Sequence, residues 1–296
     1  MSHSAPCGFV AWQNGGSTIE DAGKAVGYKW GKYKFDCDAS GPNANVSMIH
    51  ERCFETEITK RPHNEGCSVY HLPRGWLINH PRYGPDPYAN AKTFCVVRNP
   101  FDRTVSQYIY QSLMRAGGCS NYHDLRSCPR WAFQLVCQAS KLNAYVNARF
   151  DPTKSWMPNE LQRLTAMGTQ PKSLDSAVSE DCHWLPQWLH VGGDNQPQMC
   201  NHVLHLESLD SDLQKVVDRY PQDSRLARLP KAISAQMNSM STSEHCQLSA
   251  NDLSPASVRQ LAHVYEKDFR LLGYSSSPSR PNASSHPRGM TGVFVA

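Results

Sequence analysis

The segment between residues 93 and 110 constrains the fold more than any other part of the 296-residue chain. It opens with Thr93–Val97, an apolar, β-branched run of the length expected for a strand buried on both faces. Arg98 ends this run, Asn99 can cap a helix, and Pro100 suits a first helical turn, where its missing N–H is not needed. Parallel sheets bind ligands at the carboxyl ends of their strands, and helix N-termini attract anions. The segment therefore predicts a strand, a helix and an anion site that includes Arg98.

A second candidate anion site lies near the start of the sequence. An apolar run, Cys7–Trp12, is followed by a turn rich in glycine and hydroxyl residues and then by a predicted helix over Ile19–Val26. Glycines let the backbone approach a phosphate closely, and successive N–H groups and hydroxyls can point at it. The spacing of a Walker A loop is absent, and a tight connection without a ligand would show the same residues. The candidate ligands in this turn are Gln13, Asn14, Gly15, Gly16, Ser17 and Thr18.

Composition and charge narrow the functional classes. Hydrophobic residues make up 40% of the chain and charged residues 19%, as in an ordinary globular protein with a substantial core. The net charge of +4 suits an anionic ligand but is too small to indicate nucleic acid binding. We expect no transmembrane segment, because no apolar run reaches about 18 residues, and we see no signal peptide in the first residues.

The eleven cysteines form an odd number without dense spacing. Because no secretory signal is visible, we predict that most are buried free thiols in a reducing compartment, and that the protein is cytoplasmic. The alternative is a protein of the Golgi lumen from which a membrane anchor has been removed.

Two histidines are candidates for chemistry. His71 ends a short predicted strand within Cys67–Pro73, and catalytic groups collect at strand ends in parallel sheets, although a capped, partly buried histidine would fit equally well. The second histidine, His183, begins the sequence HWLPQ. The alternative for this later region is a zinc site made of Cys182, His183, Cys200 and His202. Adjacent Cys and His residues are poorly spaced for one tetrahedral ion, so we predict no metal site.

Two later segments have helical periodicity. One predicts a helix from Pro129 to about Arg149, with Trp131, Leu135, Leu142 and Val146 as core candidates. The other predicts an amphipathic closing helix that starts at Ser254 and stops at Gly273. The following residues are rich in Ser and Pro, which is typical of a disordered tail. We therefore expect one domain over residues 1–274 and a tail over residues 275–296.

Together these segments resemble the sulfotransferases that use 3′-phosphoadenosine 5′-phosphosulfate (PAPS). RNPFDRTVS is similar to the segment that holds the 3′-phosphate, and Arg98 and Ser106 match its phosphate ligands. FVAWQNGGSTIED resembles the loop around the 5′-phosphosulfate, although Gln13 stands where that family normally has lysine. The xxHxP form at His71, HWxPQ before VLHLESL, and the YxxDFxxFGY-like ending at Tyr274 resemble Golgi-type carbohydrate sulfotransferases of the chondroitin 4-O type.

The resemblance, which spans about residues 9–274, implies a fold and a mechanism. It implies an α/β three-layer sandwich with a central parallel sheet and a P-loop-like phosphosulfate loop, and the alternation of strand and helix signals favours the same class. PAPS would be the co-substrate, and its sulfuryl group would move to a hydroxyl or amine of a glycan or small-molecule acceptor. His71 would take the acceptor proton, His183 would orient the acceptor, and no metal would be needed.

Two other functions stay open. A P-loop-type nucleotide or small-molecule kinase also uses a glycine-rich loop, but the sequence has no recognisable loop lysine or magnesium-binding carboxylate after a strand. A non-catalytic PAPS-binding protein would explain Gln13. For Arg98 itself, the alternative is a strand–helix junction in which the arginine pairs with a carboxylate and binds no ligand.

Overall fold

The computed structural model describes residues 16–33, 53–55, 67–78, 86, 88–119, 127–151, 182–193, 197–239 and 245–278. Gln13, Asn14 and Gly15 of the predicted phosphosulfate loop lie outside these ranges, as does most of the predicted tail. Among the described residues, no helix has the length and apolar character needed to cross a membrane.

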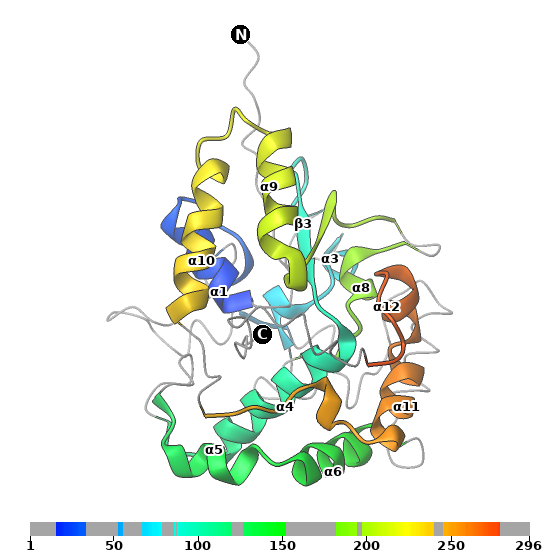
Figure 1. Cartoon of the computed structure of the whole chain (residues 1–296). Coiled ribbons are helices and arrows are strands. Elements are labelled where there is room, and N and C mark those ends of the chain that lie inside the picture. Colours follow the sequence, from blue (N-terminus) through cyan, green and yellow to red (C-terminus); the bar gives the residue numbers. More distant parts are fainter. Residues whose placement is uncertain are drawn as a thin grey trace.

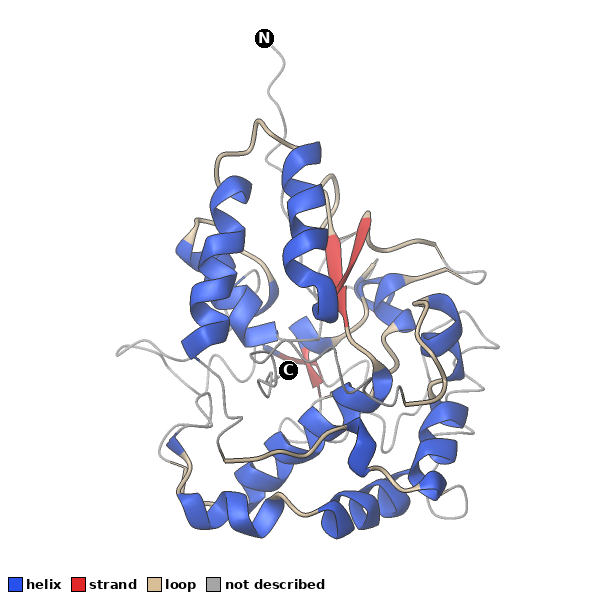
Figure 2. Cartoon of the chain, in the orientation of Figure 1, coloured by secondary structure: helices blue, strands red, loops and turns tan. Residues whose placement is uncertain are grey.

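Helices dominate the described chain, and the strands are short (Figure 2). The strands are β1 (Phe54–Glu55), β2 (Cys67–Ser68), β3 (Phe94–Val97) and β4 (His202–His205). The α-helices are α1 (Gly16–Ala25), α3 (Arg74–Leu77), α4 (Pro100–Ala116), α5 (Arg130–Val136), α6 (Ala139–Phe150), α8 (Trp188–Val191), α9 (Leu209–Arg219), α10 (Leu229–Ser239), α11 (Pro255–Val264) and α12 (Glu266–Leu271). The 3-10 helices are η1 (Gly31–Tyr33), η2 (Val69–His71), η4 (Leu206–Ser208), η5 (Leu226–Arg228) and η6 (Ala250–Asp252).

The strand and helix predicted around Arg98 are confirmed. All four residues of β3 are buried, and the strand pairs in parallel with β4, with Phe94 opposite His202 at one end of the register. Asn99 caps α4, because its side chain accepts a hydrogen bond from the N–H of Phe101 at 2.9 Å, and Pro100 occupies the first turn. Arg98 therefore stands between the carboxyl end of a buried parallel strand and the start of a helix.

The side chains of β3 alternate between two hydrophobic clusters. Phe94 and Val96 pack with residues of α1, α9 and α10, whereas Cys95 and Val97 pack with residues of α3, α4 and α8. Figure 1 shows α1, α9 and α10 gathered at one end of the molecule, with α4, α5 and α6 at the other. The structure is thus a helix-rich α/β fold with a small parallel sheet between two apolar clusters.

The helix predicted over 129–149 is divided into α5 and α6. The link between them leaves the helical conformation at Cys137, which forms a disulfide with Cys246. The break changes the phase of the apolar pattern, so α5 does not bury the face that one continuous helix would bury. The prediction that Trp131 and Leu135 belong to the core is wrong, since they are 52% and 46% exposed. The other two predicted core residues are buried: Leu142 and Val146.

The closing helix is also divided, into α11 and α12. Its start and stop are as predicted: Ser254 caps α11 by accepting a hydrogen bond from the N–H of Ser257, and Gly273 takes the left-handed conformation with φ of 76°. The break falls at Tyr265, a buried residue whose hydroxyl donates to the carbonyl of Trp184 at 3.1 Å. This tertiary hydrogen bond ties the end of the domain to the HWLPQ segment.

The cysteines within the described residues are paired, and the prediction of mostly free thiols is wrong. Disulfides join Cys67 to Cys182, Cys95 to Cys200, Cys119 to Cys128 and Cys137 to Cys246, and Cys53 is also disulfide-bonded. The fold brings the first two pairs together from distant segments, with Cα atoms 5.5 Å and 5.8 Å apart, within the span of a disulfide. The same pairing removes the zinc alternative, because the thiols of Cys182 and Cys200 are not available as ligands.

Candidate active site

Arg98 is held at the end of β3 by the side chain of Gln187. The backbone N–H of Arg98 donates to Oε1 of Gln187 at 2.8 Å, and Nε2 of Gln187 donates to the carbonyl of Arg98 at 2.8 Å. The residue is half-buried, and burial lowers the pKa of its guanidinium, while the carboxylates of Asp102 and Glu207 oppose this shift. Because arginine titrates far above neutral pH, the group remains a cation. The structure thus places a permanently charged side chain, on a backbone that Gln187 holds, at the predicted anion site.

Two further polar residues of the RNPFDRTVS segment, Arg103 and Ser106, lie on α4. Ser106 is buried on α4. The guanidinium of Arg103 is buried and donates to the carbonyls of His183 and Leu185 at 2.6 Å and 2.8 Å. Arg103 therefore stabilises the HWLPQ segment, whereas Arg98 is the arginine at the strand end.

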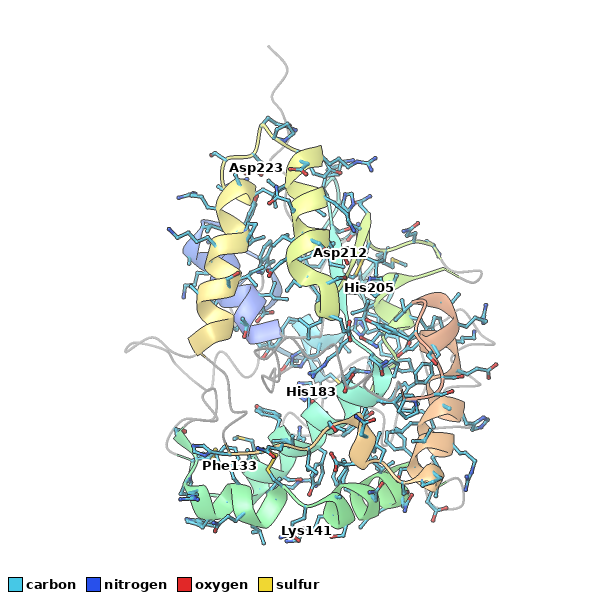
Figure 3. All side chains as sticks on the ribbon, in the orientation of Figure 1. Phe133, Lys141, His183, His205, Asp212 and Asp223 are labelled. Carbon is cyan, nitrogen blue, oxygen red and sulfur yellow. A yellow bond between two sulfur atoms is a disulfide. The ribbon has the colours of Figure 1, made fainter. Side chains whose placement is uncertain are left out.

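The two histidines predicted as catalytic and acceptor-binding residues contact each other. The ring centroids of His71 and His183 are 4.6 Å apart, in an edge-to-face arrangement. Nε2 of Gln107 lies 3.0 Å from Nδ1 of His183. An amide N–H can only donate, so Nδ1 accepts and neutral His183 carries its proton on Nε2. Figure 3 shows His183 beside α4 in the middle of the molecule.

A disulfide tethers the segments that carry these histidines. Cys67 begins β2, which pairs antiparallel with β1 and leads directly into η2, and Cys182 immediately precedes His183. The prediction that His71 ends a strand of the parallel sheet is wrong, because the strand stops at Ser68 and His71 is the last residue of η2. Cys182 also has a φ of 63°, in the left-handed region that residues with a side chain seldom adopt. Such strain is characteristic of functional sites that the surrounding structure holds in place. The covalent bond therefore fixes the relative position of two segments 115 residues apart.

A buried carboxyl group from α1 lies near this histidine pair. Glu20 is 6% exposed, and its Oε1 accepts a hydrogen bond from the N–H of Lys32 at 3.1 Å. Gly31 is required here: its φ is 51°, and a Cβ at this position would overlap the carboxylate of Glu20. Helix η1, which contains Gly31 and Lys32, packs against η2, the helix that ends at His71. Burial raises the pKa of Glu20 to about 7, while the positive charges of Lys32 and of protonated His71 lower it.

The predicted phosphosulfate loop enters the described structure only at its end. Gly16, Ser17 and Thr18 form the first turn of α1, and Thr18 is buried. The helix therefore begins three residues before the predicted start at Ile19, and these three residues belong to it and not to the predicted turn. The roles of Gln13, Asn14 and Gly15 stay predictions. Within the described ranges, no three His, Cys, Asp or Glu side chains are grouped so that they could hold a metal ion.

Sequence reasoning missed the residues that support Arg98 from behind. Asp268 is fully buried, and its two carboxylate oxygens accept hydrogen bonds from the backbone N–H groups of Gln187 at 3.0 Å and Trp188 at 2.8 Å. Burial raises the pKa of Asp268, which Arg103 and these hydrogen bonds oppose. The sequence analysis identifies the family resemblance of HWLPQ and of the closing segment Tyr265–Tyr274, but it predicts no role for Gln187 or Asp268. The usable signal is a polar residue placed inside a run of buried apolar positions.

Comparison with known proteins agrees with the family that the sequence resembles. A family model described as "Sulfotransferase family" matches residues 43–275, which is most of the chain and includes Arg98, His71 and His183. The match begins after α1, so the glycine-rich loop lies outside it. Neither the curated proteins nor the solved structures that were compared gave a significant match. The chain belongs to the sulfotransferase family.

Proposed function

We propose that the protein transfers the sulfuryl group of PAPS to a hydroxyl or amine of an acceptor and releases adenosine 3′,5′-bisphosphate. Family membership supports sulfuryl transfer in general. The cation of Arg98 at the end of β3 supports a donor that carries phosphate groups. Arg98 and Ser106 bind the 3′-phosphate, and backbone amides of Gly15 to Thr18 bind the 5′ end. The finer fold, a three-layer sandwich with a P-loop-like loop, belongs to this proposal and is supported by the two clusters that β3 separates.

The chemistry of transfer assigns a role to each histidine. The acceptor oxygen or nitrogen attacks sulfur, and the bond from sulfur to the bridging oxygen of the 5′-phosphate breaks, so that its electron pair leaves with the nucleotide. The unprotonated nitrogen of His71 takes the acceptor proton. His183, buried and fixed by Gln107, orients the acceptor. Like phosphoryl transfer, the reaction asks the protein chiefly for positioning and for stabilisation of charge on oxygen.

One observation carries this proposal: a single short segment, residues 182–187, joins the two halves of the site. The ring of His183 contacts His71, the carbonyls of His183 and Leu185 are held by Arg103, and the amide of Gln187 clamps Arg98. A residue that binds the nucleotide and a residue that receives the acceptor proton are thereby fixed relative to each other. Such an arrangement is what an in-line transfer between two substrates needs.

The disulfides bear on the compartment in which the protein acts. Disulfides persist in oxidising compartments and are rare in the cytoplasm, so they favour the Golgi lumen over the cytoplasm. A carbohydrate acceptor fits that compartment and the chondroitin 4-O resemblance. We therefore prefer a glycan to a small molecule as the acceptor class.

The test is a transfer assay with sulfur-labelled PAPS and a pool of acceptors: unsulfated chondroitin, other glycans, phenols and amines. Label should move to a glycan, and Arg98→Ala should abolish transfer at low PAPS concentration. Binding of PAPS without transfer to any acceptor would favour the non-catalytic alternative, for which Gln13 is the supporting observation. Turnover of ATP would contradict the proposal and favour a kinase.

A further inference from the structure

Just beyond the last strand pair of β3 and β4, the backbone N–H and C=O of Arg98 hydrogen-bond to a side chain and not to a neighbouring strand. The register between β3 and β4 ends with Val97 opposite His205. One residue further on, Gln187 supplies both an acceptor and a donor to the backbone of Arg98, each at 2.8 Å. A primary amide carries a donor and an acceptor side by side, as a peptide group does, so it extends the ladder by one residue.

Two more segments hydrogen-bond to residues at this end of β3. The carboxylate of Asp268 in α12 accepts hydrogen bonds from the backbone N–H of Gln187 and, at 3.5 Å, from its side-chain amide. On the other side, the N–H of Asn99 donates to Oε1 of Glu207 at 2.7 Å, and the hydroxyl of Tyr274 donates to Oε2 of the same carboxylate at 2.9 Å. Three sequence segments that lie far apart, HWLPQ, VLHLESL and the C-terminal YEKDF region, therefore converge on one strand end.

We propose that Gln187, held by Asp268, is a positioning residue that sets the direction in which the guanidinium of Arg98 leaves the end of β3, toward the 3′-phosphate of the nucleotide. This inference rests on the proposed function, because it assumes that Arg98 binds that phosphate. Gln187 itself touches no substrate. Its contribution passes through the orientation of the Arg98 backbone.

The direct test replaces Gln187 by methionine, which has a similar length and no hydrogen-bonding group at its end. The readout is the ratio of two dissociation constants, for 5′-AMP and for adenosine 3′,5′-bisphosphate, measured by calorimetry on the full chain. The two ligands differ only in the 3′-phosphate. A misdirected guanidinium loses a charge-assisted hydrogen bond, so Gln187→Met should reduce the wild-type preference for the bisphosphate by about tenfold or more. Affinity for 5′-AMP should hardly change.

A second variant gives a rescue. In Gln187→Glu, the carboxylate can still accept a hydrogen bond from the N–H of Arg98, but it cannot donate one to the carbonyl of Arg98. When the carboxyl group is protonated, its O–H can donate to that carbonyl again. The preference for the bisphosphate should therefore be lost near neutral pH and return as the pH falls, relative to wild-type protein at the same pH. The charged groups that face or surround this position are Asp268, Arg98, Arg103, Asp102 and Glu207. Because Asp268 is adjacent and the site is buried, the return should occur above the usual pKa of a glutamate.

A matched control separates positioning from general stability. Asn143 is also an amide that clamps backbone, since it accepts from the N–H of Ser254 at 2.6 Å and donates to the carbonyl of Asp252 at 2.8 Å. Asn143→Leu should lower the melting temperature without changing the nucleotide preference.

The outcomes distinguish this inference from the function on which it rests. If Arg98→Ala loses the preference and Gln187→Met keeps it, Gln187 does not position Arg98 and the inference alone is overturned. Should Asn143→Leu change the preference as much as Gln187→Met does, the effect is one of stability, which also overturns it. Wild-type protein without any preference for the bisphosphate would overturn the proposed function and the inference together.

Discussion

The nucleotide side and the acceptor side of the candidate site are held by different means. Arg98 stands in a strand–cap–helix unit encoded by neighbouring residues. The side chain of Gln187 fixes its backbone, and Glu207 accepts a hydrogen bond from the N–H of the next residue, Asn99. The pair formed by His71 and His183 exists only because two distant segments meet, and a disulfide joins them. Because the two sides are held by different contacts, we expect the proposed nucleotide and acceptor sites to fail separately. Loss of the disulfide should damage the acceptor side first.

The largest expected effect comes from the acceptor side. His71→Ala removes the proposed general base and should lower kcat by about 100- to 10,000-fold. The dissociation constant for adenosine 3′,5′-bisphosphate should stay nearly unchanged, because His71 meets the acceptor and not the nucleotide. Steady-state kinetics and calorimetry on the same preparation check both statements.

If His71→Ala kept most of its kcat while His183→Ala lost it, the proposed roles of the two histidines would have to be exchanged. We expect His183→Ala chiefly to raise the KM for the acceptor. A large loss of nucleotide affinity in either variant would break the proposed separation of the two sides.

The second effect is on stability. The Cys67–Cys182 disulfide joins residues 115 apart, and the Cys119–Cys128 disulfide joins residues only 9 apart. The crossing Cys95–Cys200 bridge stays intact when Cys67 and Cys182 are replaced by serines, so the loop that is freed has about 46 residues, 28 from Cys67 to Cys95 and 18 from Cys182 to Cys200. The loop-entropy estimate gives losses of about 4 kcal/mol for this variant and about 3 kcal/mol for the same replacement at Cys119 and Cys128. Denaturant unfolding measures both, and the acceptor KM should rise more in the first variant than in the second. Equal losses in unfolding free energy, with an unchanged acceptor KM in both variants, would show that the Cys67–Cys182 disulfide does not hold the two histidine segments in place.

The third effect is a pH dependence on the acceptor side. Burial raises the pKa of Glu20 from 4.5 to about 7, so the folded protein binds this proton more tightly than the unfolded chain does. The contribution to stability is fully present below about pH 4.5, is lost as the pH rises to about 7, and is constant above that. The loss amounts to at most about 3 kcal/mol.

Glu20→Gln removes this ionisation, so its unfolding free energy should fall less than that of wild-type protein between about pH 5 and pH 7.5. Asp210→Asn, at an exposed carboxylate of α9, serves as the control and should follow wild-type protein. An unchanged slope in Glu20→Gln would mean that this carboxyl does not carry the pH dependence.

The smallest expected effect concerns the leaving group, at the 5′ end of the nucleotide side. Gln13→Lys would place a cation near the 5′-phosphate, where charge develops in the transition state, and should raise kcat by up to about tenfold. The expected gain requires that chemistry limits turnover. Rapid-mixing measurement of a single turnover tests this step directly, and a lower rate would show that another group already fills the role.

Local signals explain what the sequence predicted well. The strand before Arg98, the cap at Asn99 and the start of α4 depend on residues within a few positions of each other, and all three are as predicted. The same holds for the cap at Ser254 and the stop at Gly273. The histidine contact is a different case, because the two residues came from a family resemblance and the structure then brought their rings together.

Long-range contacts explain what the sequence did not predict. Nothing near Cys137 shows that Cys246 will lie against it, so neither the disulfide nor the break between α5 and α6 could be read from the local pattern. Gln187 and Asp268 have the same property: each makes its important hydrogen bonds about 80 to 90 residues away in the chain. A buried polar side chain has to be satisfied, but its partner is chosen by the fold.

Three of the described disulfides cross one another along the chain. Cys67, Cys95 and Cys137 pair, in that order, with Cys182, Cys200 and Cys246. A single proteolytic cut anywhere between Cys137 and Cys182 therefore leaves two fragments joined by all three bridges, which would migrate as one species until a reductant is added. During synthesis, likewise, none of the three bridges can close until Cys182 has left the ribosome, so the first half of the chain must wait for the second before oxidation can complete its fold.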